Sequence, residues 1–314
     1  MRQGRIRRYL RHGTLPQLLV FEAIARHGSF TRAAEELHLA QPTVSGQIRK
    51  LTDTVGMPLL EQVGRRVQPT TAGRELFTAC QAIFRTLEGV EDALSDLRGL
   101  AAGTLRIASG TAGQWIVTRL LAAFGAAHPE IEVSLRVDAR QALLARLAEN
   151  ADDLYLLANP PPDDGIVAQR ILPNPLVALA RADHALAREK AVTLARFAQE
   201  PLLIREPGSG TRMLTERLLA QHGLAPRIRM ELGSDEAIVE AITAGIGVSI
   251  LSRHSVRSAG ARSTLAELGL EGFPLDSHWH FVYPVGKQLS FAAQSFLALA
   301  RAEAPRIAAD AGIE

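Results

Sequence analysis

A chain of 314 residues is long enough for two or three domains, and its 47% apolar and 22% charged residues are ordinary for a globular protein. The single cysteine, Cys80, cannot form an internal disulfide, which suits a reducing cytoplasm and favours a buried small hydrophobic side chain over a reactive thiol. No apolar run is long enough to span a bilayer, and the basic start lacks the apolar stretch of a secretory signal, so we expect a cytoplasmic protein without membrane contact.

The net charge of +2 is unevenly distributed. Residues 1–75 carry twelve Lys and Arg against six Asp and Glu, whereas the remainder has an acidic excess. A basic N-terminal part on an acidic body favours a polyanionic partner for that part alone. Because five of the twelve basic residues lie within residues 1–11, a solvated basic tail is the alternative.

Short helical patterns come first along the chain. The apolar face of the first helix consists of Leu15, Leu18, Leu19, Phe21, Ile24 and Ala25. This helix is expected to end near Gly28, and Thr31 is expected to cap a second helix. After a turn at residues 38–41, Pro42 suits the first position of a third helix, where its missing N–H has no helical partner. Spacings of four, three and four in the third helix predict one buried stripe: Val44, Ile48, Leu51 and Val55.

The other faces of the third helix carry side chains suited to base edges and phosphates. Two short helices around a tight turn, the second with a polar outer face, are typical of a helix-turn-helix, and residues 58–71 predict a hairpin-like wing after it. We therefore expect a winged helix-turn-helix over residues 14–72; the alternative is a three-helix bundle with a solvated face. The residues expected to contact double-stranded promoter DNA are Thr31, Arg32, Gln41, Pro42, Thr43, Ser45, Gln47, Arg49, Lys50, Arg65 and Arg66.

A heptad pattern follows the wing. Spacings that alternate between four and three place apolar residues on one seam: Leu76, Cys80, Ile83, Leu87, Val90, Leu94 and Leu97. We expect a helix over residues 73–100 that pairs copies of the chain into a dimer or tetramer, since two half-sites on DNA require two-fold symmetry. The alternative is one amphipathic helix packed on its own body. The glycines of residues 98–104 predict the helix end and a hinge.

Beyond residue 104, short apolar strands alternate with helices. The predicted strands are residues 104–109, 131–137, 153–158, 201–206, 227–232 and 247–252, and the predicted helices are 114–128, 142–150, 212–222 and 235–243. This alternation predicts an α/β domain over residues 104–305, with parallel sheets wrapped by helices. Two such sets suggest two lobes, the second at about residues 176–277, with a ligand cleft at the carboxyl ends of the strands. Residues 278–286 are expected to return the chain to the first lobe.

The turns from strand to helix carry hydroxyls beside basic residues. Hydroxyls and free backbone N–H groups at helix N-termini make anion sites, and Arg205 or Arg212 would add positive charge. The candidate ligand residues in these turns are Ser109, Gly110, Thr111, Arg205, Ser209, Thr211, Arg212, Ser234 and Asp235. For any one turn, plain N-capping is the alternative. All of them facing one cleft would make a site for a small anionic effector.

Signals for catalysis or a cofactor are missing from the sequence. The Ser-Gly-Thr turn at residues 109–111 lacks the lysine of a P-loop, and no G-x-S-x-G motif or acid–base pair is recognisable. His278 and His280 share one face of a predicted strand, but no third metal ligand lies nearby in the sequence. We therefore expect neither an enzyme nor a cofactor nor a metal site.

Residues 30–73 contain an ordered set of motifs that resembles the N-terminal part of LysR-type transcriptional regulators. The motifs are F-T-x-A-A-x-x-L from Phe30, Q-P-x-V-S-x-Q-I-x-x-L from Gln41, G-x-P-L-L from Gly56 and T-A-G from Thr71. Thr52 and Gln62 replace a glutamate and an arginine usual in the family, and Gly46 lies inside the third helix, so the bases read are left open.

The body resembles the two-lobed effector domain of the same family, which is similar to periplasmic binding proteins. Residues 205–212 and 231–252 are most similar to the CbbR-type regulators of Calvin-cycle operons, whose effectors are phosphorylated or anionic metabolites. The resemblance implies that Arg140 and Gln141 also meet the ligand, and that RNA polymerase is a partner. The alternatives are a ligand-binding protein without DNA binding and an α/β enzyme with an oligomerisation helix.

Overall fold

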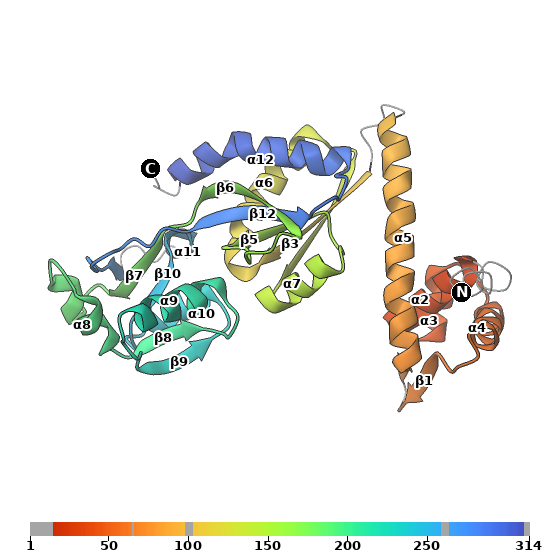
Figure 1. The fold of residues 1–314 in the computed structure, drawn as a ribbon, viewed down its shortest axis with the longest axis horizontal. Coiled ribbons are helices and arrows are strands. Elements are labelled where there is room, and N and C mark those ends of the chain that lie inside the picture. The colour runs from red at the N-terminus through yellow and green to blue at the C-terminus, as the bar shows by residue number, and fades with distance from the viewer. Residues whose placement is uncertain (1–14, 65, 98–102, 259–263, 311–314) are drawn as a thin grey trace. The chain divides into compact units, whose positions relative to one another are not determined.

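The computed structural model describes residues 15–64, 66–97, 103–258 and 264–310, and Figure 1 shows the order of the elements. The chain divides into two compact units, Met1–Glu91 and Asp92–Glu314. The division falls inside one long helix, α5 (Thr71–Leu97). None of the described helices has both the length and the apolar character needed to cross a membrane.

The first unit is a winged helix-turn-helix. Its elements are α2 (Leu15–His27), α3 (Phe30–Glu36), α4 (Gln41–Val55), β1 (Leu60–Val63), β2 (Arg66–Pro69) and the start of α5. The stripe in α4 is buried as its spacing predicts, because Val44, Ile48 and Leu51 are at most 8% exposed. β1 and β2 pair antiparallel, which confirms the hairpin. Arg65, predicted at the tip of the wing, lies outside the described residues.

The N-cap of α3 lies two residues earlier than predicted. The Ser29 hydroxyl, not that of Thr31, accepts the hydrogen bond from the backbone N–H of Arg32 at 3.3 Å. Since the helix therefore begins at Phe30, Thr31 lies inside its first turn and is exposed. The prediction of Thr31 as the cap was wrong, and its side chain is left available for other partners.

The periodic apolar residues divide between core and surface. Leu15 and Leu19 of α2 are 49% and 41% exposed. The core is contacted by the other residues of the predicted face, which include Leu18, Phe21 and Ile24. In α5, Cys80 is fully buried in the core of the first unit, and Leu76 packs on that core. This start of the predicted seam thus packs on its own chain, as the alternative interpretation held. The next seam positions, Ile83, Leu87, Val90 and Leu94, are exposed.

The second unit contains two lobes. The sheet of the first lobe has the order β4 (Ile131–Asp138), β3 (Gly103–Gly110), β5 (Leu154–Ala158), β12 (His278–Pro284), β6 (Ile166–Pro173). α6 (Gln114–Ala127) and α12 (Phe291–Asp310) share one core with the sheet, and α7 (Arg140–Ala148) packs on residues of the opposite face. β12 lies between β5 and β6, which confirms the predicted return of the chain.

The second lobe also has helices against both faces of its strands. β7 (Leu176–Arg181) pairs with β10 (Ser249–Ser252) and β11 (Leu265–Glu267), and β8 (Leu202–Arg205) pairs with β9 (Ile228–Leu232). A bridge between Leu202 and Val248 joins the two pairings. One core includes α8 (Leu194–Ala198) and α9 (Gly210–Gln221), and the other includes α10 (Asp235–Thr243) and α11 (Arg253–Ser258).

The sheets are mixed rather than parallel as predicted. β3 is parallel to β4 and β5, but β12 is antiparallel to both of its neighbours, and β7 is antiparallel to β10 and β11. Strand–helix alternation predicts parallel pairs only where consecutive strands stay in one sheet. Here the chain leaves the first lobe and returns to it, and the strands next to these crossings run in the opposite direction. The same crossings account for β6 and β7, which the strand pattern did not predict.

The two crossings between the lobes lie side by side. Leu176 and Leu275 exchange backbone hydrogen bonds of 3.1 and 2.9 Å, and the Asn174 N–H donates to the Ser277 carbonyl at 2.7 Å. The side chains of Asn174 and Ser277 are buried, and the Ser252 hydroxyl donates to the Asn174 amide oxygen at 2.6 Å. Buried polar groups that are hydrogen-bonded in this way specify one arrangement of the connection.

Candidate functional site

The outer face of α4 is polar and accessible. Gln41, Pro42, Thr43, Arg49 and Lys50 are exposed, and Ser45 and Gln47 are half-buried on the same helix. Gly46, between the last two, has nothing within 4 Å of the position of a Cβ atom. The face therefore presents amide, hydroxyl and cationic groups without an apolar patch, which suits contacts to base edges and phosphates.

The basic groups near this face are not neutralised by the protein. Among the residues that the structure describes, no carboxylate forms an ion pair with Arg32, Arg49, Lys50 or Arg66. Arg26 provides the contrast, because it pairs with Glu22 at 3.0 Å and with Glu36 at 2.5 Å. Cations on α3, α4 and the wing that pair with no carboxylate of the described chain give a positive surface for a polyanion.

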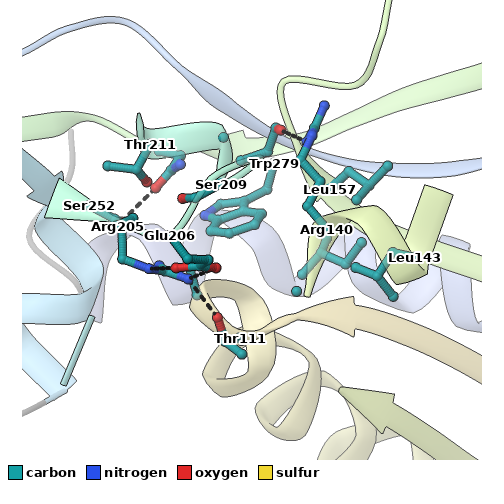
Figure 2. Close-up of a pocket in the computed structure, with 16 residues that line it drawn as sticks. Thr111, Arg140, Leu143, Leu157, Arg205, Glu206, Ser209, Thr211, Ser252 and Trp279 are labelled. Atoms are coloured by element: carbon teal, nitrogen blue, oxygen red, sulfur yellow. Dashed lines mark hydrogen bonds and ion pairs between the residues drawn. The ribbon is translucent and has the colours of Figure 1, made fainter. Parts of the chain in front are cut away.

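A small cavity lies between the two lobes of the second unit, at the carboxyl ends of β3, β5 and β8. Its volume is about 50 Å³, and the helical segments that begin at Thr111, Arg140 and Gly210 open onto it. Figure 2 shows Trp279 between Arg140 on one side and the pair Arg205–Glu206 on the other. This is the position where ligands bind in open α/β sheets.

Arg205, at the end of β8, is the most connected residue of the cavity. Its Nε donates to Glu206 at 2.7 Å, its Nη1 donates to Asp235, and its Nη2 donates to the Thr111 hydroxyl at 2.9 Å. Burial lowers the pKa of this guanidinium, but the hydrogen bonds and charges of Glu206 and Asp235 raise it above its usual value. Because Thr111 belongs to the first lobe, the same side chain also connects the two lobes.

Arg140, at the start of α7, is a cation of another kind. Its Nη1 and Nη2 donate to the backbone carbonyls of Ala158 at 2.8 Å and of Asn159 at 2.7 Å. Within the described ranges no carboxylate pairs with it, and burial lowers the pKa of its guanidinium. Carbonyl groups fix the orientation of the guanidinium but leave its charge uncompensated, which makes Arg140 the natural partner for an anion.

The predicted hydroxyls at the helix starts are partly available. Ser209 is the N-cap residue of α9, yet its side chain makes no capping hydrogen bond, and it lines the cavity with Gly210 and Thr211. Gly110 and Thr111 line it from the first lobe. The start of α9 thus directs the positive end of its helix dipole toward the space that Arg140 borders.

Four of the ligand residues predicted in the strand-to-helix turns lie outside the lining of this cavity. Ser109 is buried and donates to the Gly110 carbonyl, and Ser234 caps α10 by accepting from the Ala237 N–H at 3.1 Å. Asp235 is buried between Arg205 and Ser255. Arg212 pairs with carboxylates on the surface, at 2.7 Å from both Glu216 and Glu231. Ser234 therefore caps a helix as the alternative interpretation held, and the charges of Asp235 and Arg212 are paired with other side chains of the protein.

A second and larger cavity adjoins the first and shares Arg140 and Gly210 with it. Its volume is about 590 Å³, and it is lined by Gln141, by the prolines at 160–162 and by the side of α9. Gln141 thus lies beside Arg140 at the start of α7, facing this second space and not the first. A ligand that enters through the larger cavity meets Arg140 before it reaches Arg205.

Several lining residues were not predicted, among them Glu206, Trp279 and Asn174. Glu206 lies in the turn at residues 205–212, where the predicted ligand residues were Arg205, Ser209, Thr211 and Arg212. Trp279 reaches the cavity because β12 is inserted beside β5, and Asn174 reaches it because of the crossing between the lobes. The pairing of β12 with β5 joins residues more than a hundred positions apart, so no local pattern indicates it. His278 and His280, the rejected metal pair, lie on the same strand, and no metal-binding group is found among the described residues.

Family models match both units. Residues 15–74 match the model described as bacterial regulatory helix-turn-helix protein, lysR family, and residues 98–305 match the model described as LysR substrate binding domain. The chain belongs to the LysR family of transcriptional regulators. The expected regulator is thereby confirmed over the alternatives of an enzyme or of a ligand-binding protein without a DNA-binding domain.

Relatives of the chain include transcriptional regulators of the RuBisCO operon. The chain is 46% identical over 288 residues to the HTH-type transcriptional activator CmpR of Synechocystis, covering 92% of this chain and 95% of that one. It is 42% identical to a RuBisCO operon transcriptional regulator of Acidithiobacillus ferrooxidans, covering 92% and 93%. A solved structure of the Synechocystis CcmR regulatory domain in complex with 2-PG aligns with a TM-score of 0.61 at 40% identity, covering 64% of this chain and 97% of that one.

Proposed function

We propose that this LysR-family chain controls genes of carbon fixation in response to a small phosphorylated anion held between the lobes of its second unit. Support for the genes comes from the relatives that are named RuBisCO operon transcriptional regulators. Support for the ligand class comes from the cavity itself and from the 2-PG complex of CcmR. The observation that carries the proposal is Arg140, a guanidinium oriented by two carbonyls with its charge facing the cavity.

The DNA-reading part of the proposal rests on α4. Thr43, Ser45 and Gln47 are proposed to read base edges in the major groove, and Arg49, Lys50 and the wing residue Arg66 are proposed to contact phosphates. Support comes from their position on α4 and β2 and from the exposure of Thr43, Arg49, Lys50 and Arg66. Buried Val44, Ile48 and Leu51 hold this helix on the core, so the polar face is presented by a rigid element. Rigid presentation is what specific base contacts require.

Pairing of two copies through α5 is proposed for the exposed part of its seam. Ile83, Leu87, Val90 and Leu94 are 38–52% exposed and recur at spacings of four, three and four. A row of apolar side chains on one helix face is stabilised by burial against a partner helix. A dimer, or a tetramer built from dimers, would place two copies of α4 on successive half-sites.

Effector control is proposed to act through the relative population of lobe arrangements. The side chain of Arg205 contacts Thr111 across the lobes, and Arg140 contacts the carbonyls that follow β5. A ligand between these groups makes different contacts when the lobes are close together and when they are apart, so its affinity for the two arrangements differs. Only such a difference in affinity shifts a conformational equilibrium. The change would pass to the spacing of the DNA-binding units, and contact with RNA polymerase is proposed for the DNA-bound form.

Isothermal titration calorimetry with 2-PG and inorganic phosphate tests the ligand site. Arg140→Gln should weaken binding of either anion by at least tenfold, since a charge-assisted hydrogen bond contributes about 1.5–3 kcal/mol. Arg136→Gln is the matched control, because Arg136 lies on the preceding strand, is 60% exposed and pairs with Asp138 outside the cavity. Equal affinities for wild type and Arg140→Gln would contradict the proposed site.

A further inference from the structure

The cavity proposed for an anion contains a carboxylate of the protein itself. Glu206 lines it together with Arg205, and its two carboxylate oxygens accept from Nε and Nη2 of Arg205 at 2.7 and 2.9 Å. This fork-to-fork geometry is the one in which Arg binds the carboxylates and phosphates of ligands. An internal residue therefore occupies the ligand-binding edge of the guanidinium.

The charges around Arg205 make this arrangement unfavourable for a second anion. The guanidinium faces two carboxylates, Glu206 and Asp235, so the group of three side chains carries an excess negative charge. Nη2 also donates to the Thr111 hydroxyl at 2.9 Å and to the Gly233 carbonyl at 3.5 Å, and the Arg205 side chain is only 4% exposed. An anion that enters from Arg140 finds no free edge on Arg205 unless one of its partners leaves.

The carboxylates of Asp235 and Glu206 differ in their burial and in the number of groups that hold them in place. Asp235 is 2% exposed, and its second oxygen accepts from the Ser255 hydroxyl, so it is fixed from two sides. Glu206 is 24% exposed, and within the described part of the chain its carboxylate accepts hydrogen bonds from Arg205 alone. It lies in the turn before Gly208, which has a φ of +85° and open space around its Cβ position. Glu206 is therefore the partner that an incoming anion can replace at the lower cost.

We infer that Glu206 is a built-in competitor of the effector: its carboxylate occupies the place on Arg205 that the bound anion takes, and binding displaces it from that place. This inference rests on the proposed function, because it concerns the same anion site. It makes Glu206 a residue that sets the affinity of the site. Because Arg205 also contacts Thr111 of the other lobe, exchange of Glu206 for a ligand changes the group that connects the lobes.

Glu206→Gln tests the inference, because it keeps the shape of the side chain and removes the competing charge. Inorganic phosphate and 2-PG should both bind this variant about tenfold more tightly than wild type, a change equivalent to about 1.4 kcal/mol. The matched control is Glu216→Gln, whose carboxylate pairs with Arg212 at 2.7 Å outside the cavity and is 45% exposed. Affinity for phosphate should be unchanged in the control. Unchanged or weaker binding by a folded Glu206→Gln, including no binding at all, overturns the inference.

The Arg140→Gln variant separates this inference from the proposed function. If Arg140→Gln binds as wild type does while Glu206→Gln binds more tightly, the role of Arg140 fails and the competitor role of Glu206 is retained. A crystal structure of the wild-type chain with 2-PG gives a second readout that needs no variant. The Glu206 carboxylate should be turned away from Arg205 in that complex, and an intact Glu206–Arg205 pair beside a bound ligand would overturn the inference.

Discussion

Replacement of Asp235 by asparagine tests whether the buried pair with Arg205 is structural. Asp235 is 2% exposed and accepts from both Arg205 and Ser255, and Arg205 is 4% exposed. Removing one partner of a buried ion pair costs about 3–5 kcal/mol, because the other charge stays buried. Glu206 still faces Arg205 in the variant, so we expect the lower end of this range, a loss of about 3 kcal/mol in the free energy of unfolding.

Tryptophan fluorescence during urea unfolding measures this loss without interference from the first unit. Both tryptophans of the chain, Trp115 and Trp279, lie in the second unit, so the signal reports the unfolding of that unit alone. Asp276→Asn is the matched control, since Asp276 is 88% exposed and surface substitutions usually stay within about 0.5 kcal/mol. A loss below about 1 kcal/mol in Asp235→Asn would refute the reasoning. So would an abolished response to 2-PG at unchanged stability, because Asp235 would then be a ligand contact.

Three further predictions concern the first unit. Gln47→Ala should relax base discrimination by about 1–3 kcal/mol in gel-shift titrations, whereas Arg66→Ala should weaken specific and random DNA alike; equal losses for both variants would contradict these roles. Leu87→Asp should dissociate the assembly in sedimentation experiments, because it places a charge in the exposed seam, while Val285→Asp on the second unit should not; an undissociated Leu87→Asp would rule out this seam. Burial raises the pKa of the Cys80 thiol to about 12, so a disulfide reagent at pH 8 should label it only after unfolding; rapid labelling of the folded chain would show that the thiol is accessible.

Local patterns predicted the first unit almost completely. The stripe of Val44, Ile48 and Leu51 follows the helical period, and Pro42 is the second residue of α4, one position later than expected because the helix begins at Gln41. These features depend on residues within one or two turns of each other, so their physical causes are contained in a short stretch of chain. The cap at Ser29 was missed because two neighbouring hydroxyl residues both suit an N-cap, and only the exact entry of the chain into α3 selects between them.

The candidate ligand site was predicted in its location but only partly in its members. Hydroxyls and arginines at strand-to-helix turns indicated an anion site, and Thr111, Arg205, Ser209 and Thr211 do line the cavity. Whether a given arginine offers its charge to a ligand depends on carboxylates that approach from elsewhere. Arg212 is paired on the surface, but Arg140 keeps an uncompensated charge within the described structure.

Local patterns in the sequence were enough to predict the period of the helices, most of the alternation of strands and helices, and the family. The tertiary structure decided which apolar positions are buried and which charges are neutralised. Cys80 belongs to the core of the first unit, although its spacing equally suits the exposed seam that begins with Ile83. Arg205 meets Thr111 across 94 positions of sequence, and Trp279 enters the cavity through a strand that returns from the other lobe. Such contacts form because surfaces from segments far apart in the sequence are buried against each other. The free energy of that burial depends on all of these segments together, so no single segment predicts the contacts.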